Sequence, residues 1–160
     1  MTKDLSNIII WTENKPGVFY RILWLFRRKM FNIESATVGH TEIQDVTRFT
    51  ITVSGDKEQV LNICRQVNKL VNVIRVEDVP GELLVARELA LIKIAIKNRE
   101  EKNEILRLIE HFRGRVINMV KNSLIIEVTG NEDKINAFYE NMQIYKILEF
   151  VRTGRTALFK

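Results

Sequence analysis

Cysteine and histidine are scarce in this sequence. The chain of 160 residues holds one cysteine, Cys64, and two histidines, His40 and His111. A single cysteine excludes an internal disulfide and a zinc site built from several cysteines, and it favours a reducing, intracellular compartment. The histidines stand far apart and no acidic pattern joins them, so the sequence predicts no metal site. Cys64 shares a helical face with Val60 and Val67, which predicts a small buried apolar side chain.

Long apolar runs and charge of one sign are also lacking. No segment approaches the roughly 18 uninterrupted apolar residues that a membrane-spanning helix needs, and residues 1–6 are too polar for a signal peptide. The net charge of +5 includes no basic block long enough to require nucleic acid. Arg27, Arg28 and Lys29 fall where a helix is expected to end, and there they offset the negative end of its dipole. These absences predict a soluble, cytoplasmic protein with no membrane or nucleic-acid partner.

Proline occurs twice, and each proline is followed by glycine. The first pair, Pro16-Gly17, interrupts the apolar stretch IIIWTENKPGVFYRILWLF at residues 8–26. The β-branched residues before the pair predict a buried strand over 5–12. Apolar residues at helical spacing after it predict an amphipathic helix over 16–29. The pair therefore marks a turn from strand to helix.

The rest of the first half continues with further strands and a second helix. Period-two patterns predict strands over 31–38 and 46–53, separated by the polar turn GHTEIQD. Gly55-Asp56 opens a helix, and a strand over 71–79 follows it. The order β-α-β-β-α-β is that of a ferredoxin-like unit, in which two helices cover one face of a four-stranded antiparallel sheet.

The second pair, Pro80-Gly81, predicts a linker over 80–85, after which the plan repeats. Predicted strands follow over 87–97, 115–120, 123–130 and 144–152, with predicted helices over 100–112 and 131–142. Gly55 and Gly130 each end a strand and open a helix, and the apolar positions after them match in register. The sequence therefore predicts an α+β chain of two tandem ferredoxin-like βαββαβ units, with domains at 1–79 and 86–160.

The turn Asn14-Lys15-Pro16-Gly17 has two interpretations. It is a good strand-to-helix connection in any protein. It also suits a small anion, because the first amides of a helix lack partners within the helix and the helix dipole favours negative charge there. Asn14 could cap the helix, Pro16 suits its first turn, and Gly17 lets a ligand approach the backbone. A single glycine matches neither a dinucleotide-binding fingerprint nor a P-loop.

Several blocks resemble one family. ENKPGV, followed by LF and then FNIESATVG, resembles the ACT domain in the regulatory, or small, subunit of acetolactate synthase (acetohydroxyacid synthase). TRFTITVSGD, QVNKLVNVIRVEDV, RELALIKI, FRGRVINM and the closing TGRTAL extend the resemblance over nearly the whole chain. It implies a non-catalytic subunit that activates a separate catalytic subunit and confers feedback inhibition by valine in branched-chain amino acid biosynthesis. Thiamine diphosphate, a divalent metal ion and FAD are expected on that catalytic subunit, and no cofactor on this chain.

The resemblance also implies that valine binds at the interface of a homodimer of ACT domains. The turn would hold the carboxylate with backbone amides, with an added hydrogen bond from the Asn14 side chain. Asn32 would contact the ligand from the neighbouring subunit, and the remaining residues would line or shape the pocket. The residues expected to bind valine are thus Asn14, Lys15, Pro16, Gly17, Val18, Asn32, Thr37 and Gly39.

Two further features of the blocks bear on regulation. Met30 stands in RRKMFNIES where the family usually has glycine, and it is expected to alter the exit of the helix and the sensitivity to valine. Arg152 and Arg155, on either side of Gly154, belong either to a solvated tail or to a surface that contacts the catalytic subunit.

Two other functions fit part of the sequence. RRM-type RNA-binding modules share the βαββαβ plan, but they need an aromatic-rich motif on a central strand, and RFTITV has one phenylalanine and no glycine. Salt-dependent RNA binding without a response to valine would favour this function. A stand-alone ACT amino-acid sensor, acting on another enzyme or on transcription, is the nearer alternative. No helix-turn-helix pattern accompanies the units, and co-purification of a thiamine-diphosphate enzyme would argue against such a sensor.

Overall fold

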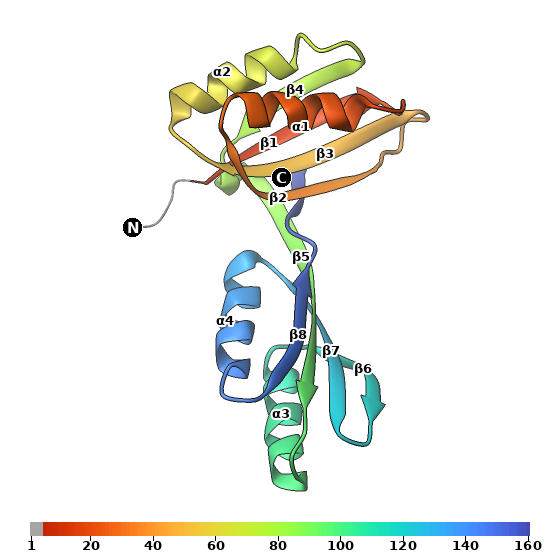
Figure 1. Cartoon of the computed structure of the whole chain (residues 1–160), viewed down its shortest axis with the longest axis vertical. Coiled ribbons are helices and arrows are strands. Elements are labelled where there is room, and N and C mark those ends of the chain that lie inside the picture. Colours follow the sequence, from red (N-terminus) through yellow and green to blue (C-terminus); the bar gives the residue numbers. More distant parts are fainter. Residues whose placement is uncertain (1–4) are drawn as a thin grey trace. The chain divides into compact units, whose positions relative to one another are not determined.

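A computed structural model describes residues 5–160 and divides the chain into two units (Figure 1). The first unit consists of the chain up to Val85 together with the closing residues Arg155–Lys160. The second unit is Ala86–Gly154. The predicted second domain, 86–160, differs from this division at residues 155–160, which lie with the first unit. The predicted linker is also structured, because residues 80–85 include a 3-10 turn, Gly81–Leu83, and the start of the next strand.

The first unit has the predicted βαββαβ order. Its strands are β1 (Leu5–Glu13), β2 (Asn32–His40), β3 (Val46–Ser54) and β4 (Val73–Val79), and its helices are α1 (Val18–Arg28) and α2 (Lys57–Val67). The strands pair antiparallel in the order β2-β3-β1-β4, which leaves β2 at one edge of the sheet. Both helices cover the same face of this sheet (Figure 1). Ile8, Ile10 and Ile51 point into the core between the sheet and the helices.

The second unit repeats the plan. It contains β5 (Leu84–Ala95), α3 (Arg99–His111), β6 (Arg115–Val120), β7 (Ser123–Gly130), α4 (Glu132–Met142) and β8 (Ile147–Arg152), with strand order β6-β7-β5-β8. The predicted correspondence between α2 and α4 is confirmed: Val60, Ile63 and Val67 are buried in the first core, and Ile135, Phe138 and Met142 are buried in the second. The two helices also begin alike, since the side chains of Asp56 and Asn131 each accept a hydrogen bond from an amide in the first turn.

The closing segment holds a strand that the sequence did not predict, β9 (Thr156–Phe159). It pairs with β5, whose first residues, Leu84 and Val85, belong to the first unit, and the amide of Lys160 donates to the Leu83 oxygen over 3.0 Å. Phe159 stacks on Trp11 with 6.1 Å between ring centroids. Trp11 follows Ile10 in β1 and so points away from the helices. The interpretation of this segment as a solvated tail is therefore wrong, because apolar side chains hold it against the helix-free face of the first sheet.

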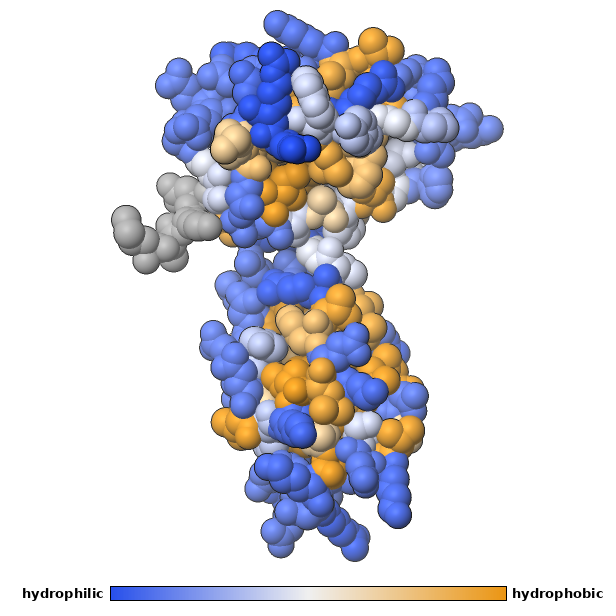
Figure 2. Space-filling model, viewed as in Figure 1, coloured by the Kyte–Doolittle hydropathy of each residue, from blue (hydrophilic) through white to orange (hydrophobic). Residues whose placement is uncertain are grey.

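Two observations concern the surface of the described residues. No helix within residues 5–160 combines the length and apolar content needed to cross a membrane, and within the same range no three His, Cys, Asp or Glu side chains group closely enough to hold a metal ion. Figure 2 shows apolar side chains in the region of the strands of the second unit. The exposed apolar residues of these strands include Ile117, Leu148 and Val151.

Candidate functional site

Residues 14–17 connect β1 to α1. Gly17 is the residue that precedes the helix, and its φ of 82° lies in the left-handed region that favours glycine. No side chain caps α1. The prediction that Asn14 caps the helix is therefore wrong, and the helix begins at Val18 rather than at residue 16 because the backbone at Gly17 is not helical.

Part of the turn's hydrogen-bonding capacity is used within the chain. The amide of Asn14 donates to the Asp45 oxygen over 2.7 Å, and the amide of Lys15 donates to the Glu13 oxygen over 2.9 Å. By contrast, the amides of Gly17, Phe19 and Tyr20 have no acceptor among residues 5–160. The first turn of α1 carries no acidic residue. Three donors at the positive end of a helix dipole are therefore available for an anion.

A network of polar side chains holds this turn in place. Glu13 accepts a 2.6 Å hydrogen bond from Asn72 and lies 2.7 Å from the Lys15 ammonium. Asn72 in turn accepts a 2.9 Å hydrogen bond from Arg21 of α1. The hydrogen bond from Lys15, and secondarily that from Asn72, lower the pKa of the Glu13 carboxyl. Lys15 thus pairs with Glu13, and its predicted part in ligand binding would have to compete with this pair.

The other predicted residues lie along β2. Because β1 and β2 each pair antiparallel with β3, they run parallel to each other. Asn32, at the start of β2, is therefore at the opposite end of the sheet from the turn, whereas Gly39 is level with Trp11 through Arg48. The nine residues of β2 span roughly 26 Å. One chain alone cannot bring Asn32 and the turn to the same small ligand.

The side chains of these residues differ in how free they are. Asn32 donates a 2.9 Å hydrogen bond to Glu34, and its side-chain oxygen stays without a donor in the described chain. Thr37 donates a 2.7 Å hydrogen bond to the Arg155 backbone oxygen, so its hydroxyl donor is already used by the closing segment. A Cβ at Gly39 would meet nothing within 4 Å. Val18 is buried in the core, and its place as an apolar wall of the pocket stays a prediction.

An apolar groove that the sequence analysis did not predict runs along the outer side of α1 toward Asn32. It is lined by Tyr20, Leu23, Trp24, Arg27, Met30, Phe31, Asn32 and Ile33. Tyr20 and Trp24 are 70% and 47% exposed. The signal for it was present, since Tyr20 and Trp24 are four residues apart and lie outside the core stripe of Ile22 and Phe26. Exposed apolar side chains gathered in one groove make it a candidate for an interface.

Met30 lies at the exit of α1. Its φ is 60°, and its amide donates to the Arg27 oxygen over 3.0 Å while the amide of Phe31 donates to the Phe26 oxygen over 3.0 Å. This pair of bonds is the Schellman motif, which prefers glycine at the left-handed position. The expected change in the helix exit is therefore not seen: the turn keeps the geometry that suits glycine, with a methionine in it.

Both arginines of the closing block are used within the chain. Arg152 binds Glu88 and Asn136 in the second unit, and Arg155 donates to the Asn7 side chain over 3.0 Å in the first. Nearby, Arg48 donates to the Ala157 oxygen and lies against the rings of Trp11 and Phe159. Burial lowers the pKa of the Arg48 guanidinium. A contact of Arg152 or Arg155 with a catalytic subunit stays a prediction.

Comparisons with known proteins identify the family. Residues 8–75 match the model of the AHAS small subunit-like ACT domain, and residues 87–160 match that of the small subunit of acetolactate synthase. A probable acetolactate synthase small subunit of Archaeoglobus fulgidus is 46% identical over 153 residues, which cover 96% of this chain and 95% of that protein. The acetolactate synthase small subunit of Bacillus subtilis is 40% identical over 94% of this chain and 87% of its own.

A solved structure agrees with these sequences. The crystal structure of the acetolactate synthase small subunit from Thermotoga maritima superposes with a TM-score of 0.90 at 37% identity, covering 98% of this chain and 97% of that one. The predicted fold, two tandem ferredoxin-like units of which the first is an ACT domain, is confirmed. This chain belongs to the family of acetolactate synthase small subunits.

Proposed function

We propose that this chain is the regulatory subunit of an acetolactate synthase: it activates a catalytic subunit, binds valine and confers feedback inhibition in branched-chain amino acid biosynthesis. Membership of the acetolactate synthase small-subunit family supports a catalytic subunit as the partner. The observation that carries the proposal for valine is the set of unused amides at Gly17, Phe19 and Tyr20. We assign thiamine diphosphate, a divalent metal ion and FAD to the catalytic subunit and none of them to this chain. A cytoplasmic location remains a prediction.

The turn before α1 suits the acidic end of an amino acid. A carboxylate there can accept hydrogen bonds from the three unused amides and from the side chain of Asn14, which has no partner among residues 5–160. The ammonium needs an acceptor, and the free side-chain oxygen of Asn32 is one. Each buried CH₂ group contributes about 0.8 kcal/mol, so a small apolar recess would favour valine over close relatives by modest factors.

A second copy of the chain can bring these groups together. The outer edge of β2 has no strand paired to it among the described residues. If two β2 strands paired antiparallel about a two-fold axis, Asn32 of a second copy would approach the end of β2 that carries Gly39 and the turn. Such a pairing needs no change in either sheet, and it completes a site that each chain holds only in part.

The groove along α1 supports the same arrangement. It begins beside Asn32 and is bordered by Tyr20, Trp24 and Met30, all of which are exposed in the single chain. Pairing at the β2 edges would bring two α1 helices toward each other and cover these apolar side chains. Burial of apolar surface contributes about 25 cal/mol per Å², so this surface would stabilise the homodimer.

Inhibition then follows from linkage between the ligand and the pair. Valine at the seam between two ACT domains favours whichever arrangement of the domains binds it more tightly. It can shift the pair only as far as its affinities for the two arrangements differ. The catalytic subunit would respond to that shift, because it contacts the same small subunits.

The test combines binding and inhibition. Calorimetry of the purified chain with valine, leucine and isoleucine measures affinity and selectivity, and assay of the catalytic subunit with added chain measures activation and inhibition. We expect Asn14→Ala and Asn32→Ala to weaken valine binding while activation remains. Gly17→Asp should weaken it further, because it adds negative charge where the carboxylate binds.

Two controls separate the ligand site from folding. Gly17→Asn matches Gly17→Asp in size, and both residues tolerate the left-handed conformation better than most, so the difference between them reports on charge. Asn118 is exposed on β6, so Asn118→Ala removes an asparagine away from the turn. Full valine sensitivity in both Asn14→Ala and Gly17→Asp would refute the site. Failure of the chain to bind or activate a thiamine-diphosphate enzyme would refute the regulatory role.

A further inference from the structure

The second unit has a counterpart of the turn that precedes α1. In the first unit the amide of Asn14 donates to the Asp45 oxygen over 2.7 Å, which ties the turn to the β2–β3 hairpin. In the second unit the amide of Ile96 donates to the Asn122 oxygen over 2.9 Å, which ties residues 96–98 to the β6–β7 hairpin in the same way. The two turns occupy equivalent places in the two βαββαβ plans.

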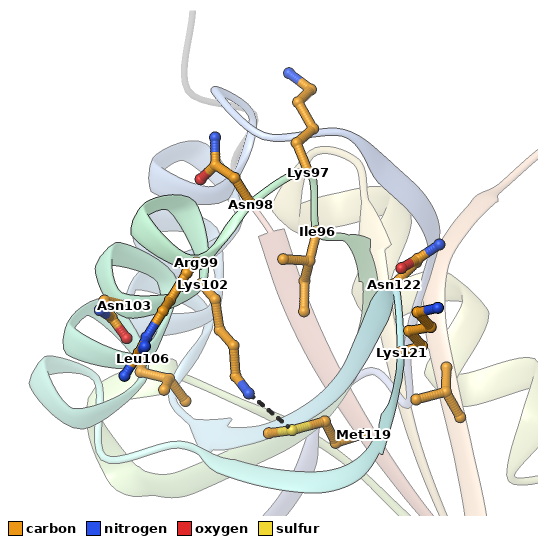
Figure 3. Close-up of a pocket in the computed structure, with 11 residues that line it drawn as sticks. Ile96, Lys97, Asn98, Arg99, Lys102, Asn103, Leu106, Met119, Lys121 and Asn122 are labelled. Carbon is orange, nitrogen blue, oxygen red and sulfur yellow. Dashed lines mark hydrogen bonds between the residues drawn. The ribbon is translucent and has the colours of Figure 1, made fainter.

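At this place the second unit is hollowed. A hollow of about 770 Å³ lies between the start of α3 and the β6–β7 hairpin (Figure 3). Its apolar part is formed by Ile96, Leu106, Met119 and Val120. Figure 3 shows Ile96 and Lys102 pointing into the hollow from one side, with Met119 across from them. A volume of this size is within the usual range of ligand pockets, about 300–1,000 Å³.

The polar lining of the hollow is basic. It includes four cationic side chains, Lys97, Arg99, Lys102 and Lys121, and no carboxylate. Lys97 points away from the hollow in Figure 3, and its ammonium lies 3.8 Å from Glu101. Arg99 and Lys121 have no ionic partner within residues 5–160. In Figure 3 Lys102 reaches into the hollow, whereas Arg99 extends along α3 and Lys121 stands on the hairpin at the opposite rim. One positive charge thus faces the space and two more stand at its rim, without a counter-charge among the residues that line it.

Lys102 gives the most specific indication. Its ammonium donates a 3.2 Å hydrogen bond to the thioether sulfur of Met119 (Figure 3), although sulfur is a weak acceptor. Lys102 is partly buried, so it has lost some hydration without gaining a strong partner. An anion in the hollow would replace this weak contact with a charge-assisted hydrogen bond, which is about twice as strong as a neutral one.

We propose that this hollow binds a small organic phosphate, with the phosphate group at Lys102, in the positive field of Arg99 and Lys121 at the rim, and the organic part on Ile96, Leu106 and Met119. A dianionic phosphate matches several unpaired cations better than a single carboxylate does, and lysine binds phosphate as a point charge. This site is separate from the turn before α1, and it does not rest on the proposed binding of valine.

The side chains, and not the end of the helix, carry this site. The start of α3 is already capped, because the Asn98 side chain accepts from the Glu101 amide over 2.8 Å and the Glu101 carboxylate accepts from the Lys97 amide over 2.6 Å. The first unit differs, since no side chain caps α1. The two units therefore present different anion sites at equivalent places, one of backbone amides and one of cationic side chains.

Methionine methyl groups provide a direct readout. The chain has four methionines, of which Met119 borders the hollow, Met142 is fully buried and Met30 borders the groove of the first unit. We expect phenyl phosphate, added to full-length protein with ¹³C-labelled methionine methyls in phosphate-free, low-salt buffer, to shift the Met119 resonance saturably. The Met30 resonance should not shift. Inorganic phosphate should bind more weakly, because it cannot reach the apolar part.

Charge variants test which residues bind. Lys102→Gln should weaken phenyl phosphate binding about tenfold, the effect of one lost charge-assisted hydrogen bond. Lys69 is exposed in the first unit, so Lys69→Gln changes net charge equally and should leave binding unchanged. Absence of a saturable Met119 shift would overturn the proposal. Equal affinities of the wild type, Lys102→Gln and Arg99→Gln would overturn it as well. Valine can be titrated into the same labelled protein. The Met30 resonance then reports on valine binding to the first unit, independently of the Met119 resonance.

Discussion

The guanidinium of Arg152, which is partly exposed, and the buried carboxylate of Glu88 form an ion pair in the second unit. Nε and Nη2 of Arg152 lie 2.7 and 2.5 Å from one Glu88 oxygen, and Glu88 is 4% exposed. Arg152→Ala would leave that carboxylate buried without its partner, which costs about 3–5 kcal/mol. We expect a loss of this size in the free energy of unfolding, measured by urea titration followed by circular dichroism.

A neighbouring arginine serves as the control. Arg87 is exposed, and within residues 5–160 its guanidinium donates only to the adjacent Ala86 oxygen, so Arg87→Ala should change the free energy of unfolding by less than about 0.5 kcal/mol. If Arg152→Ala were no more destabilising than Arg87→Ala, the ion pair would not contribute to the stability of the second unit. Contact with the catalytic subunit would then be the better account of Arg152.

Backbone strain at the start of α1 can be measured with a pair of glycine substitutions. A Cβ at Gly17 or at Gly39 would meet no atom within 4 Å, but Gly17 has a φ of 82°. Gly17→Ala should therefore lower the free energy of unfolding by about 0.5–1 kcal/mol, because the strain of about 1–2 kcal/mol is partly offset by the smaller freedom of alanine in the unfolded chain. Gly39→Ala, without that strain, should be neutral or slightly stabilising. Equal stabilities of the two variants in thermal and urea unfolding would show that the turn does not need the left-handed conformation.

The same reasoning predicts that Met30→Gly stabilises the first unit. Met30 has a φ of 60° and is 90% exposed, so glycine would relieve strain without removing packing. The relief of about 1–2 kcal/mol is partly offset by the greater freedom of glycine in the unfolded chain, about 0.4–1 kcal/mol. We expect a net gain of about 0.5–1 kcal/mol in the free energy of unfolding.

Lys29 provides the comparison for Met30. It is the preceding residue, with a φ of −90°, so glycine there relieves no strain and Lys29→Gly should be destabilising. A gain in both variants, or in neither, would contradict the role of the left-handed turn. Calorimetry of Met30→Gly with valine would also show whether the methionine changes the affinity of the neighbouring groove.

Periodicity in the sequence predicted both units because each buries one face of a sheet under amphipathic helices. The apolar stripes at Val60, Ile63 and Val67 and at Ile135, Phe138 and Met142 are local signals, and all six side chains are buried. The direction of the strands could also have been predicted from the sequence. In a βαββαβ plan the first two strands run parallel, so the sequence could have shown that Asn32 lies far from the turn.

Contacts between distant segments were not accessible in this way. β9 lies on the first unit because Phe159 stacks on Trp11 and Arg155 binds Asn7, and neither pair has a signature in local sequence. The contact of Thr37 was hidden for the same reason, since nothing near it in the sequence shows that its hydroxyl donates a hydrogen bond to the Arg155 backbone oxygen. The predicted start of α1 was wrong for a more local reason. In the sequence, a glycine that ends a turn cannot be told apart from one that begins a helix.

The closing strand gives a test that uses tryptophan fluorescence. Phe159→Ala removes the ring stacked on Trp11, so we expect a loss of about 0.5–1.5 kcal/mol in the stability of the first unit and a red shift in emission as Trp11 gains water. Leu158 is 66% exposed, and Leu158→Ala should do neither. Unchanged emission and stability in Phe159→Ala would mean that the segment does not cover Trp11 in solution.

Burial raises the pKa of the Cys64 thiol to about 12, against about 8.5 in an unfolded chain. Because the folded pKa is the higher one, its contribution to stability is complete below a pH of about 8.5 and is lost as the pH rises toward 12. At pH 8, iodoacetamide should therefore alkylate the folded protein at least about a hundredfold more slowly than the urea-unfolded chain.

A second cysteine on the same helix separates burial from local sequence. Leu61 is 38% exposed on α2, so Leu61→Cys in a Cys64→Ala background should be alkylated at an ordinary rate in the folded protein. Mass spectrometry at timed intervals measures both rates. If Cys64 in the folded protein reacted as fast as the cysteine at position 61, the thiol would be accessible, and its place in the core of the first unit would be wrong.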